Sequence, residues 1–342
     1  MRLRALLATF LLLSGTASAA PITIADPWPA LATIDTVRSE AVSFASSSPF
    51  SPADLVRHRE IPKATGHGTL YLPRQAPSDH SLPAVVMLHG AAGLVAQRSD
   101  LYGAQLASQG VAVLVVDTFG PRADRGTEFT ARLINITETM MVADAYAALA
   151  YLAARPEIDG SRVVLVGFSY GGMATTYALY RQMADLLAPP GLRFAGHVAF
   201  YGPCIGRFLD NRTTGAPLLM LYGEADEIMD ARRCGETALD LRLGGSEVET
   251  ITYAGAVHQW DGALERRLIG RNLKDCRFEV EPDGTIRDRH TMLPMTGPLL
   301  RAFELYLCTS SRPYPIGRDD AVRAKSNHDL GQFLMRVFNR SG

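Results

Sequence analysis

The chain alternates between short apolar runs and longer segments in which apolar residues recur at helical spacing. The runs hold four to six residues, which is typical of strands buried on both faces of a parallel sheet. They occupy residues 84–88, 111–116, 163–166, 196–200, 218–222 and 248–253, with a short one at 69–72. Helices are predicted at 101–109, 138–154, 171 to about 183, and 232–243. This alternation predicts an α/β fold with a mostly parallel central sheet and helices on both faces.

The alternating pattern is confined to one stretch, although a length of 342 residues would allow two domains. We assign that stretch, residues 55–308, to a single α/β domain. Residues 20–54 are rich in Ser, Ala and Pro without clear periodicity, which predicts a loosely ordered N-terminal lead. Residues 309–342 form a C-terminal helical extension that we expect to pack onto the domain. Its amphipathic helix is predicted at 329–338, with an apolar face of Leu330, Phe333, Leu334 and Val337.

Residues 1–19 have the features of a secretory signal peptide. Arg2 and Arg4 precede an apolar stretch at 5–13, and Ala17-Ser18-Ala19 fits the small-residue pattern of a cleavage site. The apolar stretch is too short to span the ~30 Å hydrocarbon core of a bilayer. The sequence therefore predicts cleavage after Ala19 and a periplasmic or secreted mature protein.

The charge balance narrows the range of partners. The chain has 34 Lys and Arg against 35 Asp and Glu, and an isoelectric point near 6.7. Because phosphate binding needs clustered basic side chains and no basic block occurs, this balance argues against a nucleic-acid partner. After the signal peptide no window qualifies as a membrane span, and the sequence carries no signal for an oligomeric state.

Export makes the four cysteines informative, because an oxidising compartment permits disulfides. Four cysteines allow three connectivities. Pairing neighbours in sequence closes two loops of about thirty residues, each worth ~3–4 kcal/mol in the chain-entropy model. That pairing joins Cys204 to Cys234 and Cys276 to Cys308. The sequence lacks Cys-x-x-Cys or close Cys/His spacing, so we predict no metal site, and no cofactor is indicated.

The pentapeptide Gly167-Phe168-Ser169-Tyr170-Gly171 places a serine between a predicted strand and a predicted helix. In that setting a G-x-S-x-G pattern is typical of a nucleophile elbow, a sharp turn at which glycines let backbone segments pass closely. The start of the helix also provides a favourable field for developing negative charge. We therefore predict that Ser169 is a nucleophile.

A serine nucleophile needs a base and an acid that orients the base. In this arrangement both follow the serine, acid first and histidine second, each just after a strand. His258 follows the last apolar run and is the predicted base. The loop after the preceding run carries several acids, from which we choose Asp226, with Glu227 and Asp230 as alternatives.

Acyl transfer also needs two N–H groups that bind the oxyanion of the tetrahedral intermediate. One is predicted to be the backbone N–H of Tyr170, directly after the nucleophile. The other is expected from the loop His89-Gly90-Ala91-Ala92-Gly93 after an earlier strand. Ala91 is the preferred donor there, and Ala92 is the alternative.

Together these residues resemble the dienelactone hydrolase family of α/β-hydrolases, over about residues 55 to 308. The resemblance rests on the loop at 89–93, Ser169 and its flanking glycines, and the motifs at 116–122, 201–204, 223–226 and 255–261. It implies the α/β-hydrolase fold, supports Asp226 as the acid and favours pairing of Cys204 with Cys234. The namesake enzymes carry Cys as nucleophile, whereas this chain has Ser169, so a general ester hydrolase is expected rather than one specific for dienelactones. The tail after Cys308 has no counterpart in the family.

The expected function is that of an exported serine hydrolase that cleaves small carboxylic esters or lactones through an acyl-enzyme. A peptidase or other amide hydrolase on the same triad is the alternative, followed by a non-catalytic binding protein. Two charged residues of the motif at 116–122 also need an interpretation. Arg122 is interpreted either as a ligand for a substrate carboxylate or as a solvated loop arginine, and Asp117 as a structural cap.

Overall fold

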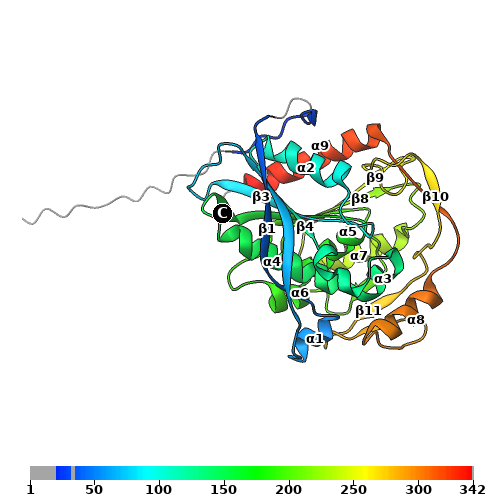
Figure 1. Ribbon diagram of the computed structural model, residues 1–342. Helices are drawn as coiled ribbons and strands as arrows, with labels where there is room; N and C mark the ends of the chain where they lie inside the picture. The colour runs from blue at the N-terminus through cyan, green and yellow to red at the C-terminus, as the bar shows by residue number, and fades with distance from the viewer. Residues whose placement is uncertain (1–20, 32–34, 341–342) are drawn as a thin grey trace, which may run out of the picture.

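A computed structural model of the chain describes residues 21–31 and 35–340. An eight-stranded sheet in the order β1-β2-β4-β3-β5-β6-β8-β9 forms its centre (Figure 1). All neighbouring pairs from β4 to β9 are parallel, and β2 runs antiparallel to both β1 and β4. The strands are β1 (Val37–Ser47), β2 (Lys63–Pro73), β3 (Leu82–Leu88), β4 (Ala112–Asp117), β5 (Ile158–Phe168), β6 (Gly196–Phe200), β8 (Leu218–Gly223) and β9 (Val248–Tyr253). The predicted α/β fold with a mostly parallel sheet is confirmed.

Helices cover both faces of this sheet, so each central strand is buried on both sides. One face packs against α4 (Glu138–Ala153), α5 (Tyr170–Leu179), α6 (Arg181–Leu187) and α7 (Ala231–Leu243). The other packs against α2 (Ala96–Ala107) and α9 (Asp320–Phe338), which lie together in Figure 1. In β3, Val85 and Met87 face the α2 and α9 side while Val86 and Leu88 face the opposite side. Burial on both faces explains the uninterrupted apolar runs.

The segment 20–54, expected to be a loosely ordered lead, instead contains a full strand of the central sheet. β1 pairs along its whole length with β2. It is an edge strand in which only Val42 and Phe44 are buried, and the remaining positions are mostly small or charged. A strand that buries so few side chains has a weak hydrophobic alternation, which is why the pattern did not predict it. The short helix α1 (Pro52–Val56) follows it.

The region after β9 is also more structured than predicted. It contains β10 (Arg267–Ile269), β11 (Phe278–Val280), β12 (Ile286–Asp288), α8 (Pro298–Cys308) and β13 (Tyr314–Ile316). β11 pairs with β12 and with β7 (Gly206–Phe208), and β10 pairs with β13. Strands of three residues are too short to show a period, so the sequence carries no signal for them. The Cys276–Cys308 disulfide lies within this region, whereas Cys204–Cys234 joins the segment before β7 to α7. Both disulfides join neighbours in sequence.

The C-terminal helix α9 packs onto the sheet as expected, but it starts nine residues earlier than the predicted 329–338. The Asp319 side chain caps its start by accepting a hydrogen bond from Val322 N. All four residues of the predicted apolar face are buried in the α2 and α9 side of the core. The Asn339 side chain bonds both backbone groups of Ile22, which ties the two ends of the described chain together.

Across the residues that the structure describes, no helix combines the length and apolar character needed to cross a bilayer. The predicted signal peptide, 1–19, lies outside them.

Arg122 is neither solvated nor free to bind a substrate, which corrects both interpretations of this residue. It lies in the short 3-10 helix η2 (Gly120–Arg125), is 2% exposed, and makes two hydrogen bonds to Asp144 at 2.7 and 2.9 Å. Its remaining donors bond Ser48 Oγ and the carbonyl oxygens of Ser47 and Thr118. The guanidinium therefore joins β1, η2 and α4. Asp117 acts as the predicted cap, because its Oδ1 accepts from Phe119 N and Gly120 N.

Replacing Asp144 with alanine is expected to lower the free energy of unfolding by about 3–5 kcal/mol, because it leaves the Arg122 charge buried without its partner. Urea denaturation followed by circular dichroism measures the change. Asp185→Ala is the matched control, since it removes ion pairs to Arg181 and Arg193 in which every side chain is 39% to 53% exposed. That control should cost no more than about 1 kcal/mol. Equal losses in the two variants would contradict the assignment of Arg122 to a buried structural pair.

Candidate active site

Ser169 occupies the sharp turn between β5 and α5. Its backbone has φ 53° and ψ −111°, a conformation that a non-glycine residue adopts only under strain. A Cβ on Gly167 would lie 2.1 Å from the carbonyl oxygen of Gly171, and one on Gly171 would lie 2.6 Å from those of Leu88 and His89. Both flanking glycines are therefore needed for the close backbone approach at this turn. The predicted strand, turn and helix are all present.

The structure brings together the three side chains predicted to form a triad. Ser169 Oγ lies 2.9 Å from His258 Nε2, and His258 Nδ1 lies 2.7 Å from Asp226 Oδ2. The three residues are 8%, 2% and 4% exposed. Asp226 follows β8 and His258 follows β9, so parallel strands carry both side chains to the edge of the sheet at which β5 delivers Ser169.

The other acids of the same loop make different contacts. Asp230 caps α7 by accepting from Arg232 N and Arg233 N, and it pairs with Arg277. Glu224 accepts from Gly255 N. The nearest cation to Glu227 is Arg312, at 3.9 Å on the surface. Asp226 is the acid that contacts His258, and its second oxygen accepts from Ile228 N at 3.2 Å, which fixes the carboxylate.

Two aromatic rings flank the His258 imidazole. The Tyr201 ring lies 4.7 Å from it and the Tyr314 ring 6.2 Å, measured between centroids, and both meet it edge to face. Tyr314 belongs to β13, so the tail after Cys308 contributes to the site. The His258 carbonyl oxygen also accepts from Gly317 N. Sequence patterns carry no signal for these contacts, because they join segments that are far apart in the chain.

The two segments predicted to supply N–H groups for an oxyanion both lie next to Ser169. Tyr170 is the first residue of α5, where a backbone N–H has no carbonyl partner within the helix. In the second segment, a Cβ on Gly90 would lie 3.4 Å from the Ser169 Cβ, so the loop before Ala91 passes directly beside Ser169. This loop is closed by a hydrogen bond from Gly93 N to Gly90 O. The donor roles of Tyr170 and Ala91 stay predictions.

His89 holds the loop in place as a neutral ring. Its Nε2 accepts from Thr118 N at 3.2 Å, so the proton resides on Nδ1, which donates to Gly90 O at 2.8 Å. Burial lowers the pKa of His89, so the ring stays uncharged. The His89 ring therefore ties the loop to Thr118, and its two nitrogens bond backbone groups rather than Ser169.

The Tyr170 side chain links the site to α8. Its hydroxyl donates to Ile136 O at 2.8 Å and accepts from Arg301 Nη2 at 3.3 Å. Arg301 also pairs with Glu138 at 2.8 Å and donates to Leu133 O. Burial raises the pKa of the Tyr170 hydroxyl well above its usual range, so the hydroxyl stays protonated. Although α8 has apolar side chains on its exposed face, its charged residues Arg301 and Glu304 point inward.

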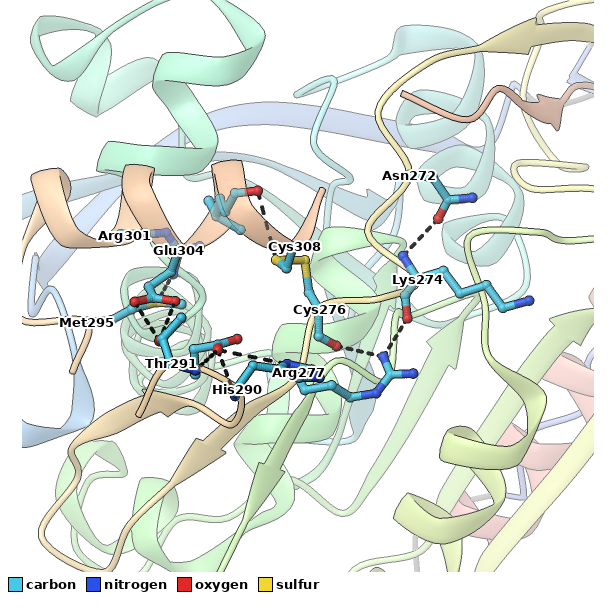
Figure 2. Close-up of a disulfide and its surroundings, with 12 residues drawn as sticks. Asn272, Lys274, Cys276, Arg277, His290, Thr291, Met295, Arg301, Glu304 and Cys308 are labelled. Atoms are coloured by element: carbon cyan, nitrogen blue, oxygen red, sulfur yellow. Dashed lines mark hydrogen bonds and ion pairs between the residues drawn. A yellow bond between two sulfur atoms is a disulfide. The ribbon is translucent and has the colours of Figure 1, made fainter. Parts of the chain in front are cut away.

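Figure 2 shows the other end of α8, where the Cys276–Cys308 disulfide joins this helix to the loop before β11. A cleft of about 490 Å³ lies beside it. The cleft is lined by Asp275, Arg277, Asp288, His290, Thr291, Leu307, Cys308, Thr309 and Ser310. Ser169, Asp226 and His258 are not among these residues, so the cleft is separate from the triad.

Within residues 21–31 and 35–340, no group of three or more His, Cys, Asp or Glu side chains could hold a metal ion.

Several known proteins are similar to this chain. Cutinase 2 of Thermobifida cellulosilytica is 33% identical over 150 residues, which cover 44% of this chain and 53% of that protein. A probable 2-oxo-3-(5-oxofuran-2-ylidene)propanoate lactonase of Bradyrhizobium sp. is 25% identical over 191 residues, which cover 52% of this chain and 73% of that protein. The chain thus spans about half the length of the cutinases it matches.

Solved structures give a weaker likeness. A putative dienelactone hydrolase from Klebsiella pneumoniae is 20% identical with a TM-score of 0.46, and the match covers 65% of this chain and 88% of that chain. The sequence model of the Dienelactone hydrolase family matches residues 67–267, which is more than half of the chain and includes Ser169, Asp226 and His258. On this match, the chain belongs to the dienelactone hydrolase family.

Proposed function

We propose that the protein is a serine hydrolase that cleaves carboxylic esters or lactones through an acyl-enzyme. The observation that carries the proposal is the continuous path from Ser169 Oγ to His258 Nε2 at 2.9 Å and from His258 Nδ1 to Asp226 Oδ2 at 2.7 Å. A serine joined to a base, and a base joined to an orienting acid, is the arrangement that activates a hydroxyl for attack.

In the proposed mechanism, Ser169 Oγ attacks the substrate carbonyl while His258 Nε2 takes its proton. Asp226 keeps the imidazole proton on Nδ1 and stabilises the imidazolium that forms. The N–H groups of Tyr170 and Ala91 bind the oxyanion, and collapse of the intermediate expels the alcohol, which takes the proton from His258. Water then attacks the carbonyl of the acyl-enzyme while His258 takes its proton. Collapse of this second intermediate returns the proton to Ser169 and releases the acid.

The family and the relatives support an ester or lactone as the substrate. The chain belongs to the dienelactone hydrolase family, and its relatives include cutinases and a probable lactonase. The triad by itself does not choose between ester and amide bonds. Small-molecule esters are therefore proposed as substrates on the strength of the family, with no cofactor required by the mechanism.

We also propose that the catalytic unit is one domain and that the mature protein is exported. The tail after Cys308 supplies Tyr314 beside His258 and buries α9 against the sheet, so it is part of that unit rather than an appendage. Two disulfides and the predicted signal peptide at 1–19 support a periplasmic or extracellular location, where disulfides persist.

Labelling and substrate profiling test this function together. A fluorophosphonate probe is expected to modify the folded protein once, at Ser169, as read by peptide mass spectrometry, and to leave heat-denatured protein unmodified. A panel of p-nitrophenyl esters of varied acyl length, simple lactones and peptide anilides should show turnover of esters or lactones. Turnover of anilides alone would instead support a peptidase, and absence of both labelling and turnover would support a binding protein.

A further inference from the structure

A second network of buried charged and polar groups lies behind His258. It consists of Arg98, Asp261 and Tyr201, which are 5%, 0% and 0% exposed. Arg98 Nε donates to Asp261 Oδ2 at 2.9 Å, and the Tyr201 hydroxyl donates to Asp261 Oδ1 at 2.5 Å. The proposed reaction makes no direct use of these three side chains, which we call the Asp261 network.

The network joins three segments that border the triad. Arg98 lies in the first turn of α2, just after the loop that contains Ala91. Tyr201 directly follows β6, and Asp261 lies three residues after His258. The Arg98 guanidinium lies 5.4 Å above the ring of Phe168, the residue before the nucleophile. Each member of the network thus contacts, or lies close in sequence to, a residue of the triad or its immediate neighbour.

Stability alone is a weak reason for such a network, because the cost of desolvating a buried ion pair often equals or exceeds its Coulombic gain. Desolvation opposes the charge of Arg98, but its neighbours, Asp261 first among them, together outweigh this effect and raise the guanidinium pKa overall. Burial raises the pKa of Tyr201 well above its usual range, so its hydroxyl keeps its proton and donates a hydrogen bond to the Asp261 carboxylate. Tyr201 is thereby held by an ionised acceptor, a stronger bond than one between neutral groups.

The Tyr201 backbone is also constrained. Its φ of 38° is in the left-handed region, which a tyrosine occupies only when its surroundings fix it there. The backbone N–H donates to Leu221 O at 2.7 Å, and the side chain is fixed at its far end by Asp261. Both ends of this residue are thus held, and its ring meets the imidazole of His258 at 4.7 Å with an angle of 65° between the planes.

We propose that Tyr201 is a positioning residue, held by Asp261 and Arg98, whose ring limits the tilt of the His258 imidazole. Ser169 and Asp226 hold the two ring nitrogens, and both of these bonds lie near the plane of the imidazole. Rotation out of that plane is resisted by packing, and Tyr201 provides the closest aromatic contact. This inference rests on the proposed function, because it assigns Tyr201 a role only if His258 is the base.

The Tyr201→Phe variant tests the proposal. It keeps the ring but removes the bond to Asp261, so the ring loses its anchor. We expect kcat per fluorophosphonate-titrated site on p-nitrophenyl acetate to fall by about 10-fold, while KM changes little, since small misplacements of a catalytic group cost up to about 100-fold. Tyr253→Phe is the matched control, because its hydroxyl also bonds a carboxylate, Asp329, at 2.7 Å, yet its ring does not touch His258. The control should keep wild-type kcat.

Proton NMR gives a readout that a purely structural role would not move. The His258 Nδ1–H, bonded to Asp226, should give a low-field resonance that shifts or broadens in Tyr201→Phe and stays unchanged in Tyr253→Phe. Asp261→Asn should lower kcat similarly, and the double variant with Tyr201→Phe should be no worse than the lower single variant, as expected for residues that act as a unit.

Wild-type kcat and an unmoved resonance in Tyr201→Phe would overturn the proposal, even if its melting temperature fell. If Asp261→Asn fails to fold, the comparison of Tyr201→Phe with the wild-type protein still decides the question, because Tyr201→Phe nearly conserves the volume of the core. Failure of the proposed function itself is recognised separately, in the wild-type protein, by the absence of labelling at Ser169.

Discussion

Replacing Ser169 with alanine is expected to lower kcat/KM for ester hydrolysis by about 10⁴-fold or more, because it removes the atom that attacks the carbonyl. The fold should remain intact. Alanine takes up less space at a position where the side-chain hydroxyl bonds His258, and the strained φ of 53° is as costly for alanine as for serine. Hydrolysis of p-nitrophenyl acetate and fluorophosphonate labelling measure the loss, and urea denaturation measures the stability.

Ser246→Ala is a suitable control for that experiment. Ser246 is also buried, and its hydroxyl bonds Thr213 Oγ1 at 2.8 Å, but it lies just before β9 and makes no contact with the triad. This variant should keep its activity while losing about 1 kcal/mol of stability. If Ser169→Ala hydrolysed esters as fast as Ser246→Ala, the acyl-enzyme mechanism would be wrong.

The central sheet was predictable because parallel strands buried on both faces leave uninterrupted apolar runs. β6 and β9 match their predicted ranges, and β8 extends one residue beyond its predicted end. The order of Ser169, Asp226 and His258 along the chain followed from the same runs, since each residue comes just after a strand. Local sequence therefore predicted both the parallel strands and the carboxyl edge at which the candidate triad lies.

The parts that could not be predicted depend on contacts between distant segments. β1 buries only two side chains, so its strand character comes from pairing with β2 and not from its own pattern. From the sequence, Arg122 is interpreted as a loop arginine. Its burial becomes clear only from its hydrogen bonds to Asp144, which lies in α4. The Asp261 network has the same origin, because Arg98 and Asp261 are 163 residues apart.

The identity of the acid is the point at which sequence and geometry complement each other most directly. Four acids crowd the loop after β8, and spacing alone left Glu227 and Asp230 as alternatives to Asp226. In the structure Asp230 is engaged at the start of α7, and the nearest cation to Glu227 is on the surface. Only Asp226 has a carboxylate oxygen within hydrogen-bond distance of the imidazole among the residues described.

Asp226→Asn should therefore lower kcat by about 10⁴-fold with little change in fold, because a neutral amide neither stabilises the imidazolium nor holds the required tautomer. Asp230→Asn is the matched control. Asparagine caps a helix as well as aspartate does, so this variant loses only the partly exposed pair with Arg277, costs at most about 1 kcal/mol, and keeps wild-type kcat. Turnover of p-nitrophenyl acetate per labelled site measures both. A larger loss in Asp230→Asn than in Asp226→Asn would transfer the acid role to Asp230 and require the loop after β8 to rearrange during catalysis.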